Sequence, residues 1–267
     1  MYEIVNPMHP DKIADRIAGA LVDLAYIKQN DPRIAVEVLI GHSDCTIIAE
    51  TSCNFTQDEV KSIVSRIADK PCRVHYHEVP QDPHLAANSN CGDNGIFKGV
   101  KWNDEEIELY EEAKRWYNDF RSDGKYIIHD SNYIICQSNA GDMIVGENFI
   151  VNPLGNWTGG INVDTGATNR KLGSDMGRAV TGGGLHGKDI HKADLSVNVY
   201  LHILAEQDGL EHTAFCPIGS KFVYIDSKPV EFAIIMREAY KFIKSIGGFE
   251  KLAEWGLRFE NTLNSTR

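Results

Sequence analysis

The first residues whose types could do chemistry together are His9, Asp11 and Lys12, which flank Pro10. The apolar residues that follow recur at the spacing of an amphipathic helix: Ile13, Ile17, Leu21 and Leu24. Pro10 suits the first turn of such a helix, where its missing N–H costs nothing. Three unlike titratable groups therefore surround the positive end of a helix dipole, which favours an anion such as a metal-bound phosphate. The simpler alternative is a carboxylate that only caps the helix.

A glycine-rich segment at positions 182–189 reads Gly-Gly-Gly-Leu-His-Gly-Lys-Asp and fits the GxxxxGK pattern of a P-loop. Two features argue against a P-loop. Lys188 is followed by Asp189 in place of a Ser or Thr that would bind Mg²⁺, and no buried strand precedes the loop. The segment ends a long glycine-rich stretch, residues 152–187, and a loop of that length in a compact domain is usually functional.

Several segments resemble motifs of the S-adenosylmethionine synthetases (methionine adenosyltransferases), in the family's order from residue 3 to about 225. Residues 9–15 match the end of SEGHPDKIAD, and residues 92–95 resemble GDQG. The stretch Asn152-Pro153-Leu154-Gly155, with Trp157 and the residues up to Lys171, resembles NPTGRF…GGPxGDxGLTGRK. Residues 182–189 resemble GGGAFSGKD with one residue deleted, and residues 192–197 correspond to the following KVDRSA.

The chain also departs from these motifs. Pro7 replaces the Glu of SEGH, GDQG has become GDNG, and TGRK has become Thr168-Asn169-Arg170-Lys171. The chain is shorter than family members by about a small domain, mainly before Gly92, in the middle region and at the C-terminus. A shortened and divergent member is therefore expected.

The resemblance implies that the methionine sulfur attacks the ribose C5′ of ATP and expels triphosphate, which is then cleaved to phosphate and diphosphate. Because the leaving group is highly charged, the main catalytic task is electrostatic stabilisation. Two alternatives stay open. One is a non-catalytic nucleotide-binding or regulatory relative of the same fold, and the other is an enzyme that uses a different thioether or triphosphate substrate.

The resemblance also assigns residues. Catalytic roles fall on His9, Lys188 and Arg170. Contacts to ATP fall on His9, Asp123, Lys125, Asn156, Trp157, Asp164, Arg170, Lys171 and Lys188. Contacts to methionine fall on Glu50, Gln81, Asp164 and Lys192.

Two Mg²⁺ ions per site are expected on Asp11 and Asp194, and a K⁺ ion on Glu37. His75 and His77 share one face of an expected strand but have no third ligand near them in sequence, which argues against a transition-metal site.

A shortened lid is expected between Pro80 and Gly92. By resemblance this loop follows Gln81 and closes over the substrates, and such lids exclude water and often set turnover.

Hydrophobic periodicity, turn residues and a capping box at Thr56–Glu59 predict helices and strands in alternation. Helices are expected near 10–24, 57–67, 103–120, 190–205, 230–246 and 250–257, and strands near 34–40, 46–50, 74–79, 126–129, 133–136, 149–151, 212–216 and 221–225. Without a strict βαβ rhythm, these elements predict an α+β fold of layered, mainly antiparallel sheets with helices on one face. Two to three similar sub-domains are expected, approximately at 1–100, 101–150 and 151–267, with discontinuous sub-domains as the alternative.

The composition limits the classes of partner that this protein is expected to bind. The 267 residues are 42% apolar and 24% charged, without an apolar run long enough to span a bilayer, and the N-terminus shows no signal-peptide pattern. A net charge of −11 argues against general nucleic-acid binding. Six cysteines without a CxxC pair suggest reduced core residues in a cytoplasmic protein. The resemblance implies a homodimer, with a tetramer as the alternative, and ATP and L-methionine as small-molecule partners.

Overall fold

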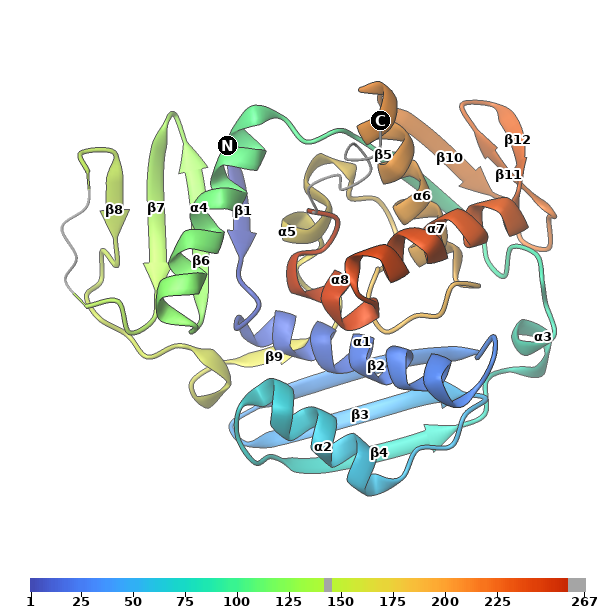
Figure 1. Cartoon of the computed structure of the whole chain (residues 1–267), viewed down its shortest axis with the longest axis horizontal. Coiled ribbons are helices and arrows are strands. Elements are labelled where there is room, and N and C mark those ends of the chain that lie inside the picture. The colour runs from blue at the N-terminus through green and yellow to red at the C-terminus, as the bar shows by residue number, and fades with distance from the viewer. Residues whose placement is uncertain (142–145, 259–267) are drawn as a thin grey trace.

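The computed structural model describes residues 1–141 and 146–258, and within them the strands form three four-stranded sheets (Figure 1). Every strand pair is antiparallel except β3–β4 and β7–β8. Each sheet is covered by helices on one side. This arrangement confirms the predicted α+β class of layered, mainly antiparallel sheets.

The first sheet has the order β4-β3-β2-β9 and lies under helices α1 and α2 (Figure 1). Its elements are α1 (Pro10–Lys28), β2 (Ile34–Gly41), β3 (Asp44–Thr51), α2 (Gln57–Ala68), β4 (Arg73–Val79) and β9 (Thr165–Ala167). Alternate residues of β2 are buried beneath α1, namely Ile34, Val36, Val38 and Ile40. The two-residue turn between β2 and β3, His42 and Ser43, has positive φ at both positions, as a tight hairpin requires.

The second sheet has the order β1-β6-β7-β8 and packs against helix α4. Its elements are β1 (Tyr2–Val5), α4 (Asp104–Phe120), β6 (Gly124–His129), β7 (Asn132–Gln137) and β8 (Phe149–Val151). Helix α4 starts with a capping box between Asn103 and Glu106. Its buried face, which includes Leu109 and Trp116, forms an aromatic-rich core with Tyr126 of β6.

The third sheet has the order β12-β11-β10-β5 and packs against helices α6 and α7. Its elements are β5 (Gly95–Gly99), α6 (Ala193–Asp208), β10 (His212–Cys216), β11 (Phe222–Ile225), β12 (Lys228–Glu231) and α7 (Phe232–Ile246). Gly99 of β5 lies so close to α6 that a Cβ there would stand 2.4 Å from the Leu201 carbonyl oxygen. Helix and sheet therefore touch through backbone at this point.

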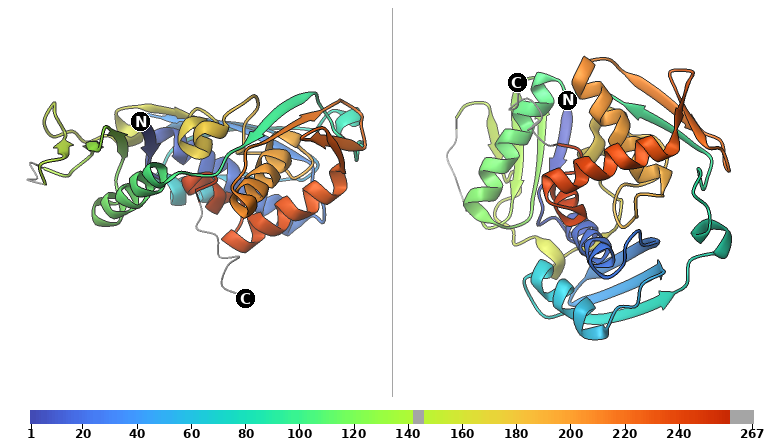
Figure 2. Two further views of the ribbon diagram at one scale, coloured as in Figure 1. Left: turned by 90° about the horizontal axis from the view of Figure 1, so that it is seen from above. Right: turned by 45° about the vertical axis from the view of Figure 1, so that its right-hand side comes forward.

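Helix α8 (Phe249–Trp255) crosses α1 at the centre of the molecule (Figure 1). The two helices meet at Gly19, where a Cβ would lie 2.6 Å from the Phe249 carbonyl oxygen. Seen from above, the long helices gather along one side of a flattened molecule and most strands along the other (Figure 2). The helices are thus predominantly on one face, as predicted.

The long glycine-rich stretch is mostly turns, with a few short elements. These are η1 (Gly160–Asn162), β9, α5 (Leu172–Met176) and η2 (Gly177–Ala179). The predicted lid segment likewise contains one short helix, α3 (Pro83–Ala86), whose N-cap is Asp82.

The predicted helices and strands all occur, with shifts of a few residues at their ends. Strands β1, β5, β9 and β12 were missed: β1, β5 and β9 are short and pair with strands that are distant in sequence, whereas β12 forms a hairpin with β11 where the start of a helix was expected. As a result, the sheets take strands from both sides of residues 100 and 150: β1 joins β6, β5 joins β10, and β9 joins β2.

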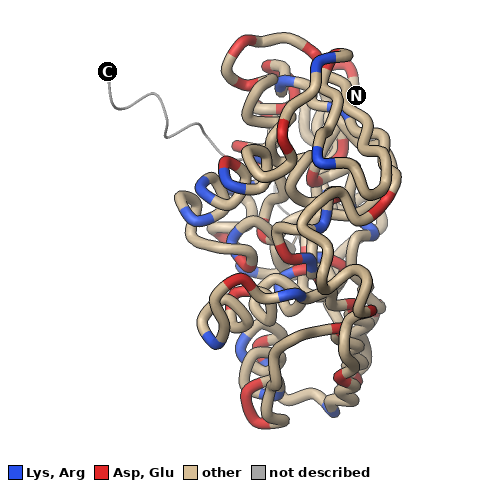
Figure 3. Tube along the Cα trace, turned by 90° about the vertical axis from the view of Figure 1, so that its right-hand side faces the viewer, with Lys and Arg blue, Asp and Glu red and all other residues tan. Residues whose placement is uncertain are grey.

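All six cysteines are unpaired. No helix among the described residues is long and apolar enough to cross a membrane. Lys and Arg positions are interspersed with Asp and Glu positions on the face drawn in Figure 3, without a continuous basic stretch.

Candidate active site

The N-terminus of α1 is capped by His9, whose Nδ1 accepts a hydrogen bond from the backbone N–H of Asp11 (3.2 Å). Asp11 therefore does not cap the helix. Its buried carboxylate accepts a hydrogen bond from the Ala167 N–H (2.9 Å) and lies 3.0 Å from Lys171 Nζ and 3.5 Å from Arg170 Nη1. The helix start and the 167–171 segment are thus joined through one carboxylate.

Burial lowers the pKa of His9 to about 4. Asp11 opposes this shift, whereas Lys171 and Lys125 add to it. His9 is therefore neutral at pH 7. Because Nδ1 accepts the hydrogen bond from the cap, the ring hydrogen is assigned to Nε2, which makes His9 a neutral hydrogen-bond donor.

A cavity of about 520 Å³ opens beside this helix start. Nine residues predicted from the sequence line it: His9, Asp11, Asp123, Lys125, Asn156, Trp157, Asp164, Arg170 and Lys171. The lining is completed by Cys136 and by residues 152–155. Sequence reasoning did not identify Cys136, because nothing in a strand pattern shows which cavity a strand residue faces.

Asp123 is the most perturbed carboxyl group at this cavity. Burial raises its pKa to about 6, and the Asp164 and Asp11 carboxylates add to the shift, although the Gly160 N–H and Lys171 oppose it. One carboxylate oxygen accepts a hydrogen bond from the Gly160 N–H (2.7 Å). The other, Oδ1, is buried without a partner, so Asp123 has an unused acceptor at the cavity.

Asn152 positions the loop that carries Trp157. Its side chain pairs with both backbone groups of Gln137, accepting from N–H and donating to C=O at 2.9 Å each, and it also accepts from Trp157 Nε1 (3.3 Å). Gly159 has φ of +51° and lies against the indole, where a Cβ would stand 2.3 Å from a ring carbon. Only glycine fits there.

A second cavity, of about 290 Å³, lies between the 188–194 segment and the start of β5. Its lining includes Glu50, Lys188, Lys192 and Asp194 from the predicted set, together with residues 92–94. Lys188 Nζ lies 2.6 Å from Asp194 Oδ2. The Asp194 carboxylate also contacts Gly183, whose φ is +76°. Buried Gln81 borders a small adjoining space that also contacts Lys192.

The predicted residues therefore separate into two groups within one chain. Asp11, Arg170 and Lys171 line the first cavity, whereas Lys188 and Asp194 line the second. Within one chain, the structure does not bring Asp11 and Asp194 to the same cavity. Glu37 lines neither cavity: it is exposed on β2 and accepts a hydrogen bond from the Thr168 hydroxyl.

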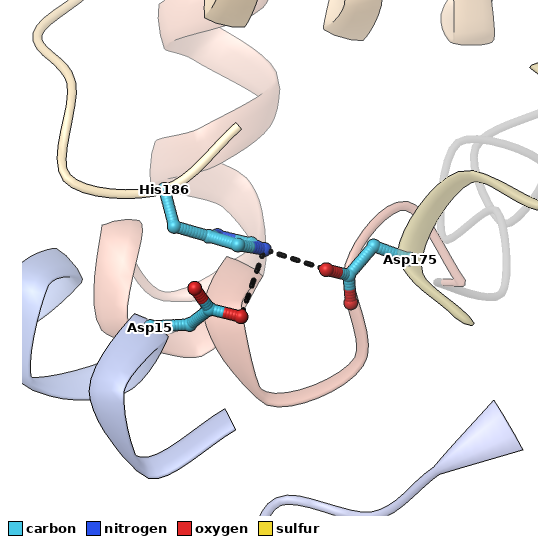
Figure 4. Close-up of side chains that lie close together, drawn as sticks. All are labelled: Asp15, Asp175 and His186. Atoms are coloured by element: carbon cyan, nitrogen blue, oxygen red, sulfur yellow. Dashed lines mark hydrogen bonds and ion pairs between the residues drawn. The ribbon is translucent and has the colours of Figure 1, made fainter. Parts of the chain in front are cut away.

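Asp15, Asp175 and His186 form a buried cluster whose ligand atoms lie within 4.8 Å of one another, close enough to suggest a metal site (Figure 4). However, Lys12 Nζ lies 2.5 Å from Asp175 Oδ1, 3.2 Å from Asp15 Oδ2 and 3.4 Å from His186 Nε2. The ammonium group therefore already supplies a cation between the two carboxylates, and we interpret the cluster as a structural ionic network.

This network was not foreseen from the sequence, which placed Lys12 beside an anion with His9 and Asp11. Lys12 instead turns into the core and is fully buried. The i,i+3 spacing of Lys12 and Asp15 on one helix was the available signal. Burial opposes the charge on Asp175, but the ion pairs with Lys12 and His186 outweigh it and lower the pKa of Asp175.

Comparisons with known proteins agree with these observations. Residues 1–81 match the family model for the S-adenosylmethionine synthetase N-terminal domain. The S-adenosylmethionine synthase of Desulfosudis oleivorans is 32% identical over 108 residues, which is 36% of this chain and 28% of that protein. The S-adenosylmethionine synthase of Acholeplasma laidlawii is 26% identical over an alignment of 313 positions, covering 87% of this chain and 80% of that protein.

For most of the curated relatives, the aligned part is thus well under half of their length. The fold extends further than the sequence similarity. The structure of an unusual S-adenosylmethionine synthetase from Campylobacter jejuni superposes with a TM-score of 0.72 at 18% identity, covering 96% of this chain and 94% of that one. Residues 1–81 are therefore similar to the N-terminal domain of the S-adenosylmethionine synthetases, and the chain as a whole has the fold of this synthetase structure.

Proposed function

We propose that this protein forms S-adenosyl-L-methionine from ATP and L-methionine, by attack of the sulfur on the ribose C5′ and release of phosphate and diphosphate. The observation that carries the proposal is the first cavity. Arg170 and Lys171 converge there on Asp11, beside a neutral His9 at a helix N-terminus. Such a set of fixed donors and cations suits the stabilisation of a departing triphosphate.

On the nucleotide side, each residue has a defined task. Lys125, Arg170 and Lys171 neutralise phosphate oxygens, and His9 donates from Nε2 to the triphosphate. Trp157 supplies an aromatic face for adenine. The unpartnered Asp123 Oδ1 accepts a hydrogen bond from a hydroxyl of the nucleotide. Asn156 and Asp164 complete the lining.

Asp11 and Asp194 suit Mg²⁺, because each presents a carboxylate next to cations that are themselves phosphate ligands. The bound Mg²⁺ ions would neutralise charge on the triphosphate. Lys171 and Lys188 now pair with these two carboxylates, and both ammonium groups are free to move to phosphate oxygens when substrate binds. Glu37, with the Thr168 hydroxyl beside it, offers oxygen ligands that suit K⁺.

On the methionine side, we assign Glu50 and Lys192 at the second cavity, and Gln81 beside it, to the amino and carboxyl groups of the amino acid. Gln81 Nε2 is buried without a partner, so it has a hydrogen-bond donor to offer. Asp164 belongs to the same assignment but lines the first cavity. Methionine binding therefore requires residues of both groups.

We infer that the active unit is a homodimer in which the first cavity of one protomer faces the second cavity of its partner. A complete site needs both groups, and one chain keeps them in separate cavities. The outer faces of two sheets expose large apolar side chains, among them Leu39, Ile48, Ile96 and Phe215, which a second copy would cover. A tetramer would be a pair of such dimers. We place the protein in the cytoplasm.

The test is to incubate the purified protein with ATP, L-methionine, Mg²⁺ and K⁺ and to follow the sulfonium product by mass spectrometry. An Asp11→Asn variant serves as the matched inactive control. ATP binding without product would favour the non-catalytic relative, and turnover only with methionine analogues would favour another thioether substrate. Light scattering across a dilution series tests the dimer, and a fully active monomer would contradict it.

A further inference from the structure

One edge of β2 is paired by two separate segments of the glycine-rich stretch. Strand β9 pairs with Leu39–Gly41, and the Thr168 N–H donates to the Val38 carbonyl (3.1 Å). Further along the same edge, the Val36 N–H donates to Gly187 C=O (2.7 Å) and the Asp189 N–H donates to Ile34 C=O (3.0 Å). The segment that carries Arg170 and Lys171 thus approaches the segment that carries Lys188 end to end along one strand.

Asn169 joins these two segments at the point where they meet. Its side-chain oxygen accepts a hydrogen bond from the His186 N–H (2.9 Å), and its side-chain nitrogen donates to the His186 carbonyl (3.1 Å). Its own backbone N–H donates to Asp15 Oδ1 (2.7 Å). Asn169 therefore holds His186 by both backbone groups and is itself held to the buried ionic network.

Asn169 also has an uncommon backbone conformation. Asn169 has φ of +61°, in the left-handed region that asparagine tolerates better than most residues. The side chain lies against Gly184, where a Cβ would stand 2.4 Å from Asn169 Cγ. The family motif TGRK has glycine at this position, which supplies the same φ but no side chain. The pair of hydrogen bonds between the Asn169 side chain and the His186 backbone is therefore a departure of this chain from that motif.

We propose that Asn169 is a positioning residue that fixes the Arg170–Lys171 segment and the Lys188 segment relative to each other, so that the two cavities which one protomer contributes to the dimer keep a fixed spacing before the triphosphate binds. This inference rests on the proposed function of the two cavities. Neither Asn169 nor His186 needs to touch the substrate. Their contribution is to hold the backbone of the two segments that carry Arg170, Lys171 and Lys188, so that less loop ordering remains for the binding step.

The first test probes the hydrogen bonds between Asn169 and His186 directly, by measuring hydrogen exchange of the His186 amide. Asn169→Gly keeps the left-handed φ but removes both side-chain bonds, so the His186 amide should exchange at least tenfold faster. Asn169→Asp keeps an acceptor for that amide and should keep most of its protection. Ser227→Gly, at another left-handed position in the β11–β12 turn (φ +68°), is the matched control and should leave the His186 amide unchanged.

The second test measures pre-organisation, by calorimetric titration of the full-length protein with inorganic tripolyphosphate in the presence of Mg²⁺. Asn169→Gly should bind it about tenfold more weakly, a change of about 1.4 kcal/mol, while Ser227→Gly binds as the wild type does. The Tm of each variant shows whether it is folded. In turnover, the loss should fall on the KM for ATP more than on kcat.

The outcomes separate the two proposals. If the wild type binds tripolyphosphate and Asn169→Gly binds it equally well, the positioning role is wrong while the proposed function stands. If the His186 amide exchanges at the same rate in the wild type and in Asn169→Gly, the Asn169 side chain does not protect this amide and the inference fails. If the wild type itself does not bind magnesium tripolyphosphate, the proposed function fails, and the positioning role with it.

Discussion

Replacing Lys12 with methionine should be among the most destabilising single substitutions in this protein. Among the residues that the structure describes, Lys12 is the only lysine with a fully buried side chain, and its ammonium lies between Asp175 and Asp15 at 2.5 and 3.2 Å. Methionine has a similar length and fills the space, so the change removes the charge with little change in packing. It leaves two buried carboxylates without their cation.

The expected cost at pH 7 is about 3–5 kcal/mol, the usual penalty for removing one partner of a buried ion pair. Proton uptake sets a limit on this cost. A carboxyl group with an unfolded pKa of about 3.9 can be protonated at pH 7 for about 4 kcal/mol, at about 1.36 kcal/mol per pH unit. If Asp15 and Asp175 share one proton in the folded variant, the loss of unfolding free energy cannot exceed about this value.

The same limit predicts a pH dependence. A carboxyl group that takes up a proton in the folded variant has a folded pKa above its unfolded value, so acid favours that folded state. At pH 5 the protonation costs only about 1.5 kcal/mol. The deficit of Lys12→Met relative to the wild type should therefore shrink from about 4 to about 1.5 kcal/mol between pH 7 and pH 5.

Urea unfolding at the two pH values, followed by circular dichroism, measures both numbers, and thermal unfolding at pH 7 should show a Tm lower by about 8–16 °C. Lys28→Met is the matched control, because Lys28 pairs with Glu59 at 2.8 Å in a partly exposed position. This substitution should cost under about 1 kcal/mol. A deficit below about 1 kcal/mol for Lys12→Met, or one that does not shrink in acid, would refute this reasoning. The network also needs no metal, so EDTA should leave the wild-type Tm unchanged.

Asp11→Asn and Asp194→Asn should each reduce turnover by orders of magnitude and leave the circular dichroism spectrum unchanged. Near-normal activity in either variant would remove that residue from the metal assignment. Glycine substitutions across 85–90 should affect turnover little, whereas Gln81→Ala should mainly raise the KM for methionine; a severe loss in the loop variants would instead make this short segment a working lid. Burial lowers the pKa of His202 to about 4, so the unfolded chain binds a proton below pH 6.5 that the folded chain does not. The protein should therefore lose about 2 kcal/mol of unfolding free energy between pH 7 and pH 5 through this residue. Urea unfolding of His202→Leu at the two pH values should show a loss that is smaller by this amount, and an unchanged loss would contradict the role of His202.

The elements that could be predicted from the sequence are those whose determinants are local. The helix from Pro10 follows from a 3.6-residue period and a proline at its first turn, and the helix after Thr56 follows from a capping box that the structure contains. Hairpins such as β2–β3 follow from alternation and a tight turn. Each of these signals spans only a few residues, so the chain determines them wherever the segment lies.

Strand pairing over long distances could not be predicted in this way. Strand β1 pairs with β6, more than a hundred residues away, and β5 pairs with β10 across a similar separation. These strands are short, and their identity depends on the partner edge that the rest of the fold provides. Backbone hydrogen bonds carry no sequence signature, so local patterns leave such strands unassigned.

The residue types of the candidate site were identifiable from ordered motifs, but their grouping was decided by tertiary structure. Asp11 meets Lys171 because β9 pairs with β2 and brings the 167–171 segment to the start of α1. Lys12, the next residue, turns the opposite way into a buried ionic network, because adjacent helical side chains point about 100° apart. A sequence orders residues along one dimension, whereas a shared cavity depends on distances in three, and those are set only when the sheets have paired.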